Sequence, residues 1–283
     1  MKDTITTFSK SLIQHGKESD RLYLMRLDPE EDAGFIRDLE DLALKRQYGK
    51  IVAKVPATAE GFFLESGFVK EAEVPSYFDN MEDCLFMAKY YDHRRARDRS
   101  KAVVDEVLQT ALSKEGSKNC SLDPLDPNME LRPCTKDDAK SMAQLYKKVF
   151  ATYPFPIDRA SYLKETMVED TRYYGIFKDD IPVALASVDQ DPINRTGELT
   201  DFATDSDHQG ESLATRLLYR MEEDMKNKGY ETLYTITRST SLGVNTIFAK
   251  SDYEFTGTLI NNTQISGRVE SMNVWHKKVQ QST

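Results

Sequence analysis

The stretch from Thr204 to Met225 has the composition of an anion-binding turn that leads into a helix. Apolar residues recur at helical spacing in its second half, namely Leu213, Leu217, Leu218, Met221 and Met225. Small and polar residues fill the turn before them, namely Gln209, Gly210, Ser212 and Ala214. The backbone N–H groups at a helix N-terminus are free to bind an anion, and the helix dipole favours one there. The stretch is therefore either a cradle for a phosphate group or a purely structural turn.

The elements that must position this turn follow from the hydrophobic pattern of the second half of the chain. A hairpin turn is expected at Lys178-Asp179-Asp180. The last strand of this half before the cradle leads directly into the cradle. In chain order we expect a strand at residues 129–132, a helix around Met142 to Val149, a helix near residues 158–167, and strands at residues 173–177, 182–188 and 197–203.

The first half of the chain alternates strand-like and helix-like segments. Residues 21–27 alternate apolar and polar side chains, as a half-buried strand does. Asp28 and Pro29 then predict the start of a helix, because aspartate caps helices well and proline fits the first helical position. The remaining expected elements are strands at residues 50–55, 69–74 and 83–90 and a short helix at residues 57–64.

Residues 114–128 are rich in Ser, Asp, Asn and Pro, which is typical of a linker. A linker at this place predicts a first domain at residues 1–113 and a second domain at residues 129–279. A chain of 283 residues is long enough for two domains of this size. We therefore expect an α/β protein of two domains, with the cradle in the second.

Composition excludes several classes of function. With 39% hydrophobic and 30% charged residues the chain is typical of a soluble globular protein, and its net charge of −9 argues against a nucleic-acid partner. No segment has the length of apolar residues that spans a membrane. Cys84, Cys120, Cys134 and the four histidines show no ligand spacing for a metal. We expect a cytoplasmic protein without metal or membrane partner, and the oligomeric state, a homodimer included, stays open.

Beyond the bare pattern, the cradle resembles the coenzyme A loop of the GNAT (GCN5-related) N-acetyltransferases. That loop reads Q/R-x-x-G-x-G/A, and residues 209–214 match it with Ser212 in place of the central glycine. Residues 241–255 resemble a later motif of the family. The resemblance implies a mixed, mostly antiparallel sheet flanked by helices in the second domain, with a degenerate GNAT-like companion domain before it. It also implies that acetyl-CoA is held by Phe202, Ala203, Thr204, Gln209, Gly210, Glu211, Ser212, Leu213, Ala214, Asn245 and Phe248.

Two residues depart from the family pattern. When the later motif is aligned on Tyr253, Asp252 stands where the family has glycine, and Phe248 stands where the family has the tyrosine that protonates the leaving thiolate. A thiol with an ordinary pKa of about 8.5 leaves without such an acid, so the reaction would be slowed rather than forbidden. Phe248 is either a core aromatic residue or a group that stacks on coenzyme A.

A closer resemblance covers nearly the whole chain. Residues 257–277, 197–210 and 153–157, together with N-terminal segments such as ESGFVKEAEVP, resemble the β-lysine N6-acetyltransferases. This implies transfer of an acetyl group from acetyl-CoA to the side-chain amine of β-lysine, whose product is a compatible solute. Acetylation of another small amine or amino acid, and a non-catalytic acyl-CoA-binding regulator, are the alternatives.

Acetylation of an amine needs a group that removes a proton, because a lysine-type amine with a pKa near 10.4 is protonated at neutral pH. Glu198 and Asp201 lie on the strand before the cradle, and we expect Glu198 to be the base. A spacing of three puts them on opposite faces of a regular strand, so both could face the acceptor only if the strand is bulged. Both could equally be ordinary edge or turn acids.

The remaining candidates concern the acceptor. Tyr153 and Phe155 lie on the loop that covers the acceptor site in this family, and they are expected either to wall it or to anchor the loop. The carboxylate of β-lysine calls for a basic partner, since arginine binds carboxylates through two parallel hydrogen bonds. Arg238 is the first choice, and Arg172 and Arg268 are the alternatives.

Overall fold

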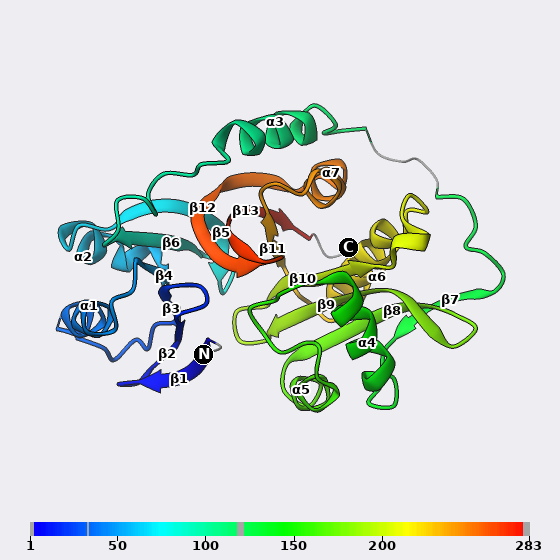
Figure 1. Ribbon diagram of the computed structural model, residues 1–283, viewed down its shortest axis with the longest axis horizontal. Coiled ribbons are helices and arrows are strands. Elements are labelled where there is room, and N and C mark those ends of the chain that lie inside the picture. Colours follow the sequence, from blue (N-terminus) through cyan, green and yellow to red (C-terminus); the bar gives the residue numbers. More distant parts are fainter. Residues whose placement is uncertain (1–2, 33, 118–121, 280–283) are drawn as a thin grey trace.

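The computed structural model describes residues 3–32, 34–117 and 122–279 of the chain. Two sheets lie side by side, and helices cover one face of the first sheet and both faces of the second (Figure 1). Residues 118–121 of the predicted linker, Cys120 among them, lie outside the described residues. None of the helices in the described ranges is long and apolar enough to cross a membrane.

The first sheet has six strands in the order β1-β2-β3-β4-β6-β5, of which only β3 and β4 run parallel to each other. Its strands are β1 (Thr4–Phe8), β2 (Ser11–Gly16), β3 (Arg21–Arg26), β4 (Lys50–Pro56), β5 (Val69–Phe78) and β6 (Glu82–Tyr90). Its helices are α1 (Phe35–Arg46) and α2 (Glu60–Glu65), the latter preceded by a 3₁₀ turn at Ala57–Ala59. Both helices cover one face of the sheet over a common apolar core.

The second sheet has seven strands in the order β12-β13-β11-β10-β9-β8-β7, of which only β10 and β11 run parallel. The strands are β7 (Met129–Pro133), β8 (Thr171–Lys178), β9 (Ile181–Asp191), β10 (Thr196–Thr204), β11 (Thr232–Arg238), β12 (Glu254–Ile265) and β13 (Arg268–Lys278). The helices are α4 (Ala139–Val149), α5 (Ala160–Thr166), α6 (Leu213–Asn227) and α7 (Leu242–Lys250). Helices α4 and α5 lie on one face, and α6 lies on the other.

The two sheets repeat one connection pattern. Strands β1 to β6 have the same spatial order and the same directions as strands β8 to β13, and in both sheets a helix joins the two parallel strands. A GNAT-like companion domain would require such a repeat, although the predicted domain limits remain a prediction. Helix α3 (Lys101–Leu112) packs against α7, and its Ala111 belongs to the core of the second sheet.

The sheets share a core where β5 packs against β12. Ala72 and Phe86 of the first sheet belong to one apolar cluster with Leu259 and Met272 of the second. A buried ion pair at 2.7 Å between Lys50 and Glu71 lies beside this core, and Lys50 also donates to the carbonyl of Ile260. The two halves therefore fix each other's position and together enclose the space between the sheets.

The mixed α/β class and the flanking helices are as the sequence predicts. The expected helix start at Asp28 and Pro29 is wrong, because α1 begins at Phe35. Asp28 instead accepts a hydrogen bond from the N–H of Glu30 through its side chain, which closes a local turn. Strands β1 and β2 were not expected from the sequence.

Candidate active site

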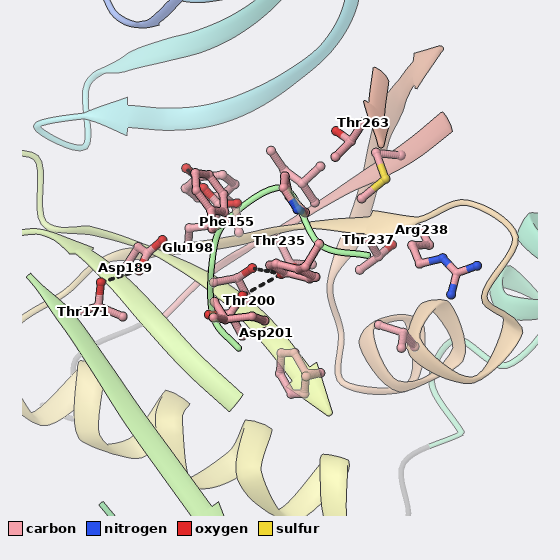
Figure 2. A pocket seen from close by; sticks show the side chains of 18 of the residues that line it. Phe155, Thr171, Asp189, Glu198, Thr200, Asp201, Thr235, Thr237, Arg238 and Thr263 are labelled. Carbon is pink, nitrogen blue, oxygen red and sulfur yellow. Dashed lines mark hydrogen bonds between the residues drawn. The ribbon is translucent and has the colours of Figure 1, made fainter. Parts of the chain in front are cut away.

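The ladder between β10 and β11 ends partway along both strands. Parallel pairing joins Thr196–Glu198 to Thr232–Tyr234 and then stops, although β10 continues to Thr204 and β11 to Arg238. The strands therefore diverge, and their unpaired backbone groups are open to a ligand. A cavity of about 1260 Å³ extends over this fork (Figure 2). Its walls at the fork include Thr200, Phe202, Thr235 and Thr237.

Strand β10 bulges immediately after the fork begins. Its register with β9 shifts between Thr200 and Ala203, and Asp201 has a φ of 56°, in the left-handed region. The extra residue reverses the alternation of side chains, so Glu198 and Asp201 line the same cavity. This is the bulged arrangement under which both predicted acids can face an acceptor.

A third carboxylate joins these two. Asp189 on β9 is the ladder partner of Glu198 and lines the same cavity. The side chain of Asp189 faces the cavity, where the surrounding protein leaves it poorly solvated. This desolvation, together with the charges of Asp201 and Glu198, raises the pKa of Asp189 to about 7. The three carboxylates line one part of the cavity, where their negative charge favours a cationic ligand.

Glu198 is held by one of its two oxygens. Tyr234 Oη donates to Oε2 of Glu198 at 2.7 Å, and Oε1 accepts no hydrogen bond from the described part of the chain. Burial raises the pKa of Glu198, while Lys54 and the hydrogen bond from Tyr234 oppose that rise. A carboxylate with a raised pKa and one oxygen facing the cavity has the properties of a general base.

Asp201 is more fully engaged than Glu198. Tyr153 Oη donates to Oδ1 at 2.6 Å, and Ser187 Oγ donates to Oδ2 at 2.7 Å. Burial raises the pKa of Asp201, and these hydrogen bonds oppose the rise. Because both oxygens are occupied, Asp201 is suited to hold Tyr153, which lines the cavity together with Phe155 from the loop between α4 and α5.

The predicted cradle lies at the other end of the same cavity. Gly210 has a φ of 88° and Ser212 a φ of 58°, and α6 begins at Leu213. The side chain of Ser212 does not cap the helix, so the first N–H groups of α6 stay available to an anion. Five of the six predicted loop residues line the cavity, namely Gln209, Gly210, Ser212, Leu213 and Ala214.

Glu211 is the loop residue that turns away. It lines a smaller hollow beside Asp123 and Arg216, and its carboxylate lies 3.1 Å from Nδ1 of His208. Phe202 and Thr204, before the loop, line the main cavity, whereas Ala203 faces the core beneath α4. Apart from Ala203 and Glu211, residues 202–214 that were predicted to hold acetyl-CoA therefore follow one continuous wall.

Asn245 and Phe248 lie behind this wall and are fully buried. Asn245 Oδ1 accepts hydrogen bonds from Thr237, Asn273 and Trp275, and its Nδ2 donates to two backbone carbonyls. Phe248 packs edge-to-face on Phe202 with 5.5 Å between ring centroids. Both residues support the cavity wall in this structure, and a direct contact of either with a cofactor remains a prediction.

Arg238 reaches the cavity, but its guanidinium already has a carboxylate partner. Its Nε and Nη2 lie 3.0 and 2.8 Å from the two oxygens of buried Glu270. Arg268 shares Glu270, and neither Arg268 nor Arg172 lines the cavity. The predicted role of Arg238 as the anchor of a substrate carboxylate therefore competes with an internal ion pair.

Sequence reasoning missed the part of the site that the first sheet provides. The cavity is also walled by Arg21, Tyr23, Lys54 and Tyr77. It also missed Asp189 and Tyr234, which become visible only once β9 and β11 are registered on Glu198. The alternating polar residues of β3 and β4 were the available signal, because they show that these strands have a second, polar face.

Known proteins resemble this chain over its cradle and over its whole length. The sequence profile described as the Acetyltransferase (GNAT) family matches residues 139–249. A β-lysine N(6)-acetyltransferase of Methanococcus maripaludis is 34% identical over 97% of this chain and 98% of its own. One of Methanosarcina mazei is 29% identical over 84% and 94%, and the N-acetyltransferase YodP of Bacillus subtilis is 25% identical over 95% and 96%.

Proposed function

The chain belongs to the GNAT acetyltransferases, in the family of the β-lysine N(6)-acetyltransferases, and we propose that it transfers an acetyl group from acetyl-CoA to the N6 amine of β-lysine. The observation that carries this proposal is the single cavity that joins the cradle before α6, the fork between β10 and β11, and the acidic cluster. An elongated thioester with a phosphate-bearing end fits such a cavity, with its phosphates at the cradle and its acyl end at the fork.

The residues that hold acetyl-CoA in this proposal are the backbone of residues 209–214 and the unpaired part of β10. The free N–H groups at the start of α6 bind the pyrophosphate. The unpaired N–H and C=O groups of residues 202–204 bind the pantetheine arm. Gly210 has open space around the position of a side chain, so phosphate oxygens can approach its backbone closely.

Chemistry then takes place beside Glu198. The acceptor ammonium group loses a proton to Oε1 of Glu198, directly or through a water molecule, and the neutral nitrogen then forms a bond to the thioester carbon. Unpaired backbone N–H groups at the fork stabilise the charge on the carbonyl oxygen. The C–S bond breaks, and coenzyme A leaves as a thiolate that takes up the second proton released by the nitrogen, since phenylalanine occupies position 248 in place of the tyrosine acid.

The acidic cluster suits a diamine acceptor. A free β-lysine carries two ammonium groups and one carboxylate, and Asp189 and Glu198 attract the cationic groups. Acetylation at N6 removes one positive charge and leaves a zwitterion without net charge. We propose that this product serves as a compatible solute, because a neutral zwitterion disturbs the ion pairs of other proteins little.

The experiment is a thiol-release assay with acetyl-CoA and a panel of amines: β-lysine, α-lysine, ornithine, spermidine and a histone-like peptide. We expect turnover with β-lysine to exceed that with every other amine. Faster turnover of spermidine or the peptide would overturn the assignment of β-lysine as the substrate. Binding of acetyl-CoA without release of thiol for any amine would favour a regulator that binds acyl-CoA.

A further inference from the structure

Lys54 is a cation of the first sheet that faces the acidic cluster of the second. It lies on β4, with its side chain on the face opposite the α1 and α2 core, and it lines the cavity. Its Nζ lies 3.2 Å from Tyr77 Oη and 5.0 Å from the centre of the Tyr77 ring. Within the described ranges Lys54 forms no ion pair with a carboxylate, so two of its three donors are unused.

Two other cations that line the cavity, Arg21 and Arg238, have their partners within the protein. Arg21 donates to the carbonyl of Asn262, to Thr263 and to Gln14. Arg238 is held by Glu270, as described above. Arg26 and Lys250 also line the cavity, but Arg26 is exposed at the end of β3 and Lys250 lies at the end of α7, away from the first sheet. Lys54 is therefore the inner cation of this wall whose hydrogen-bond donors are available to a ligand.

The charge of Lys54 is maintained in spite of its position. Burial lowers the pKa of this amine, but the electrostatic effects of its neighbours, the phenol of Tyr77 first and the carboxylate of Glu198 among them, raise it well above its ordinary value. Lys54 in turn opposes the rise in the pKa of Glu198 and Asp189. The cation and the carboxylates therefore act on each other across the cavity without touching.

The geometry suits a ligand that carries both kinds of charge. Glu198 and Asp189 are ladder partners on β10 and β9, and both interact electrostatically with Lys54, which lines the same cavity. An extended six-carbon diamino acid carries two ammonium groups and a carboxylate, which match these opposite charges. Its reacting amine can lie at the fork while its second ammonium group lies by Asp189 and its carboxylate lies toward the first sheet.

We propose that Lys54 binds the carboxylate of the acceptor, so that the first half of the chain selects amino acids over plain diamines. This inference rests on the proposed acetylation of a free amino acid. It gives the GNAT-like first half a role in specificity although it has no cradle of its own. A charge-assisted hydrogen bond of this kind changes affinity by roughly 10- to 100-fold.

The test compares β-lysine with 1,4-diaminopentane, which is β-lysine without its carboxylate. The kcat/KM for β-lysine is divided by the kcat/KM for the diamine, and this ratio is measured for the wild type, Lys54→Met, Lys54→Arg and the control Arg26→Met. We expect Lys54→Met to reduce the ratio by roughly 10- to 100-fold through the KM for β-lysine. Lys54→Arg restores most of the ratio, and Arg26→Met leaves it near the wild-type value.

The ratio cancels effects that act on both substrates, such as an altered pKa of Glu198. Acetyl-CoA affinity and thermal melting of each variant show whether it is folded. A wild-type enzyme that does not acetylate β-lysine would overturn the proposed function, and one that acetylates the diamine as fast as β-lysine would overturn the selection of amino acids over diamines. A wild type that prefers β-lysine, with an unchanged ratio in folded Lys54→Met, would overturn only the role of Lys54. A collapse of the ratio in Arg26→Met would instead assign the carboxylate to Arg26.

Discussion

Tyr234 Oη lies 2.7 Å from Oε2 of Glu198, and these two residues form the last pair that joins β10 to β11. The side-chain hydrogen bond therefore sits at the point where the sheet opens. It fixes one oxygen of Glu198 and leaves the other toward the cavity, next to the fork where the thioester is proposed to lie. The proposed base is thus positioned by the same structural feature that creates the binding site.

Glu198→Gln is expected to lower kcat by roughly 10²- to 10⁴-fold, because the amide cannot accept the amine proton. It should leave the affinity for acetyl-CoA near the wild-type value, since the cradle lies at the other end of the cavity. Thiol-release kinetics and equilibrium binding of acetyl-CoA measure the two effects. Glu223→Gln, on the exposed face of α6, is the matched control. A kcat within a few-fold of the wild type would exclude Glu198 as the base.

Asp189→Asn is expected to flatten the pH dependence of stability. The pKa of Asp189 is about 7 in the folded protein against an ordinary 3.8. The folded state therefore keeps a proton that the unfolded chain loses, and the free energy of unfolding falls as the pH rises through this window. Urea titrations at pH 5 and pH 8 should show a smaller fall for the variant. The exposed Asp180→Asn is the control, and an equal fall in all three proteins would contradict the raised pKa.

Ser212→Gly is expected to stabilise the protein by about 0.5–1 kcal/mol, because Ser212 has a φ of 58° and a side chain in the left-handed region carries a steric cost. The variant also restores the glycine of the family loop, so acetyl-CoA should bind at least as well. Chemical denaturation and calorimetric binding measure both quantities. Gly210→Ala, at a φ of 88°, should change stability in the opposite direction. A destabilised Ser212→Gly would show that the serine hydroxyl has a role.

Asn245→Ala tests whether this residue supports the wall or holds the cofactor. Its removal leaves Thr237, Asn273 and Trp275 without their shared acceptor, which should cost about 2–4 kcal/mol of stability. The KM for acetyl-CoA of the folded fraction should change little. A large rise in that KM with unchanged stability would instead support the predicted contact with acetyl-CoA.

The second half of the fold was readable from the sequence, because its signals are local. The strand expected at residues 197–203 is β10, Thr196–Thr204, and the cradle residues were recognised by type and spacing. The bulge at Asp201 was not predictable, since no glycine marks the left-handed residue there. From the sequence we could state only that Glu198 and Asp201 would face the same side of the strand if the strand contained a bulge.

The contribution of the first sheet was hidden for a different reason. Lys54 and Glu198 are far apart in the sequence, and their approach depends on how β5 packs against β12. Helix α1 was misplaced because the side chain of Asp28 closes a turn instead of capping a helix. Residues whose partners lie within a few positions were therefore predicted better than those whose partners come from the other sheet.

The central claim is tested most directly by identifying the acetylated nitrogen of β-lysine. The protein is incubated with acetyl-CoA and β-lysine, and the product is analysed by tandem mass spectrometry and two-dimensional NMR. We expect one acetyl group per product molecule, attached at N6. Acetylation at the 3-amino group, or unreacted β-lysine while another amine consumes acetyl-CoA, would contradict it.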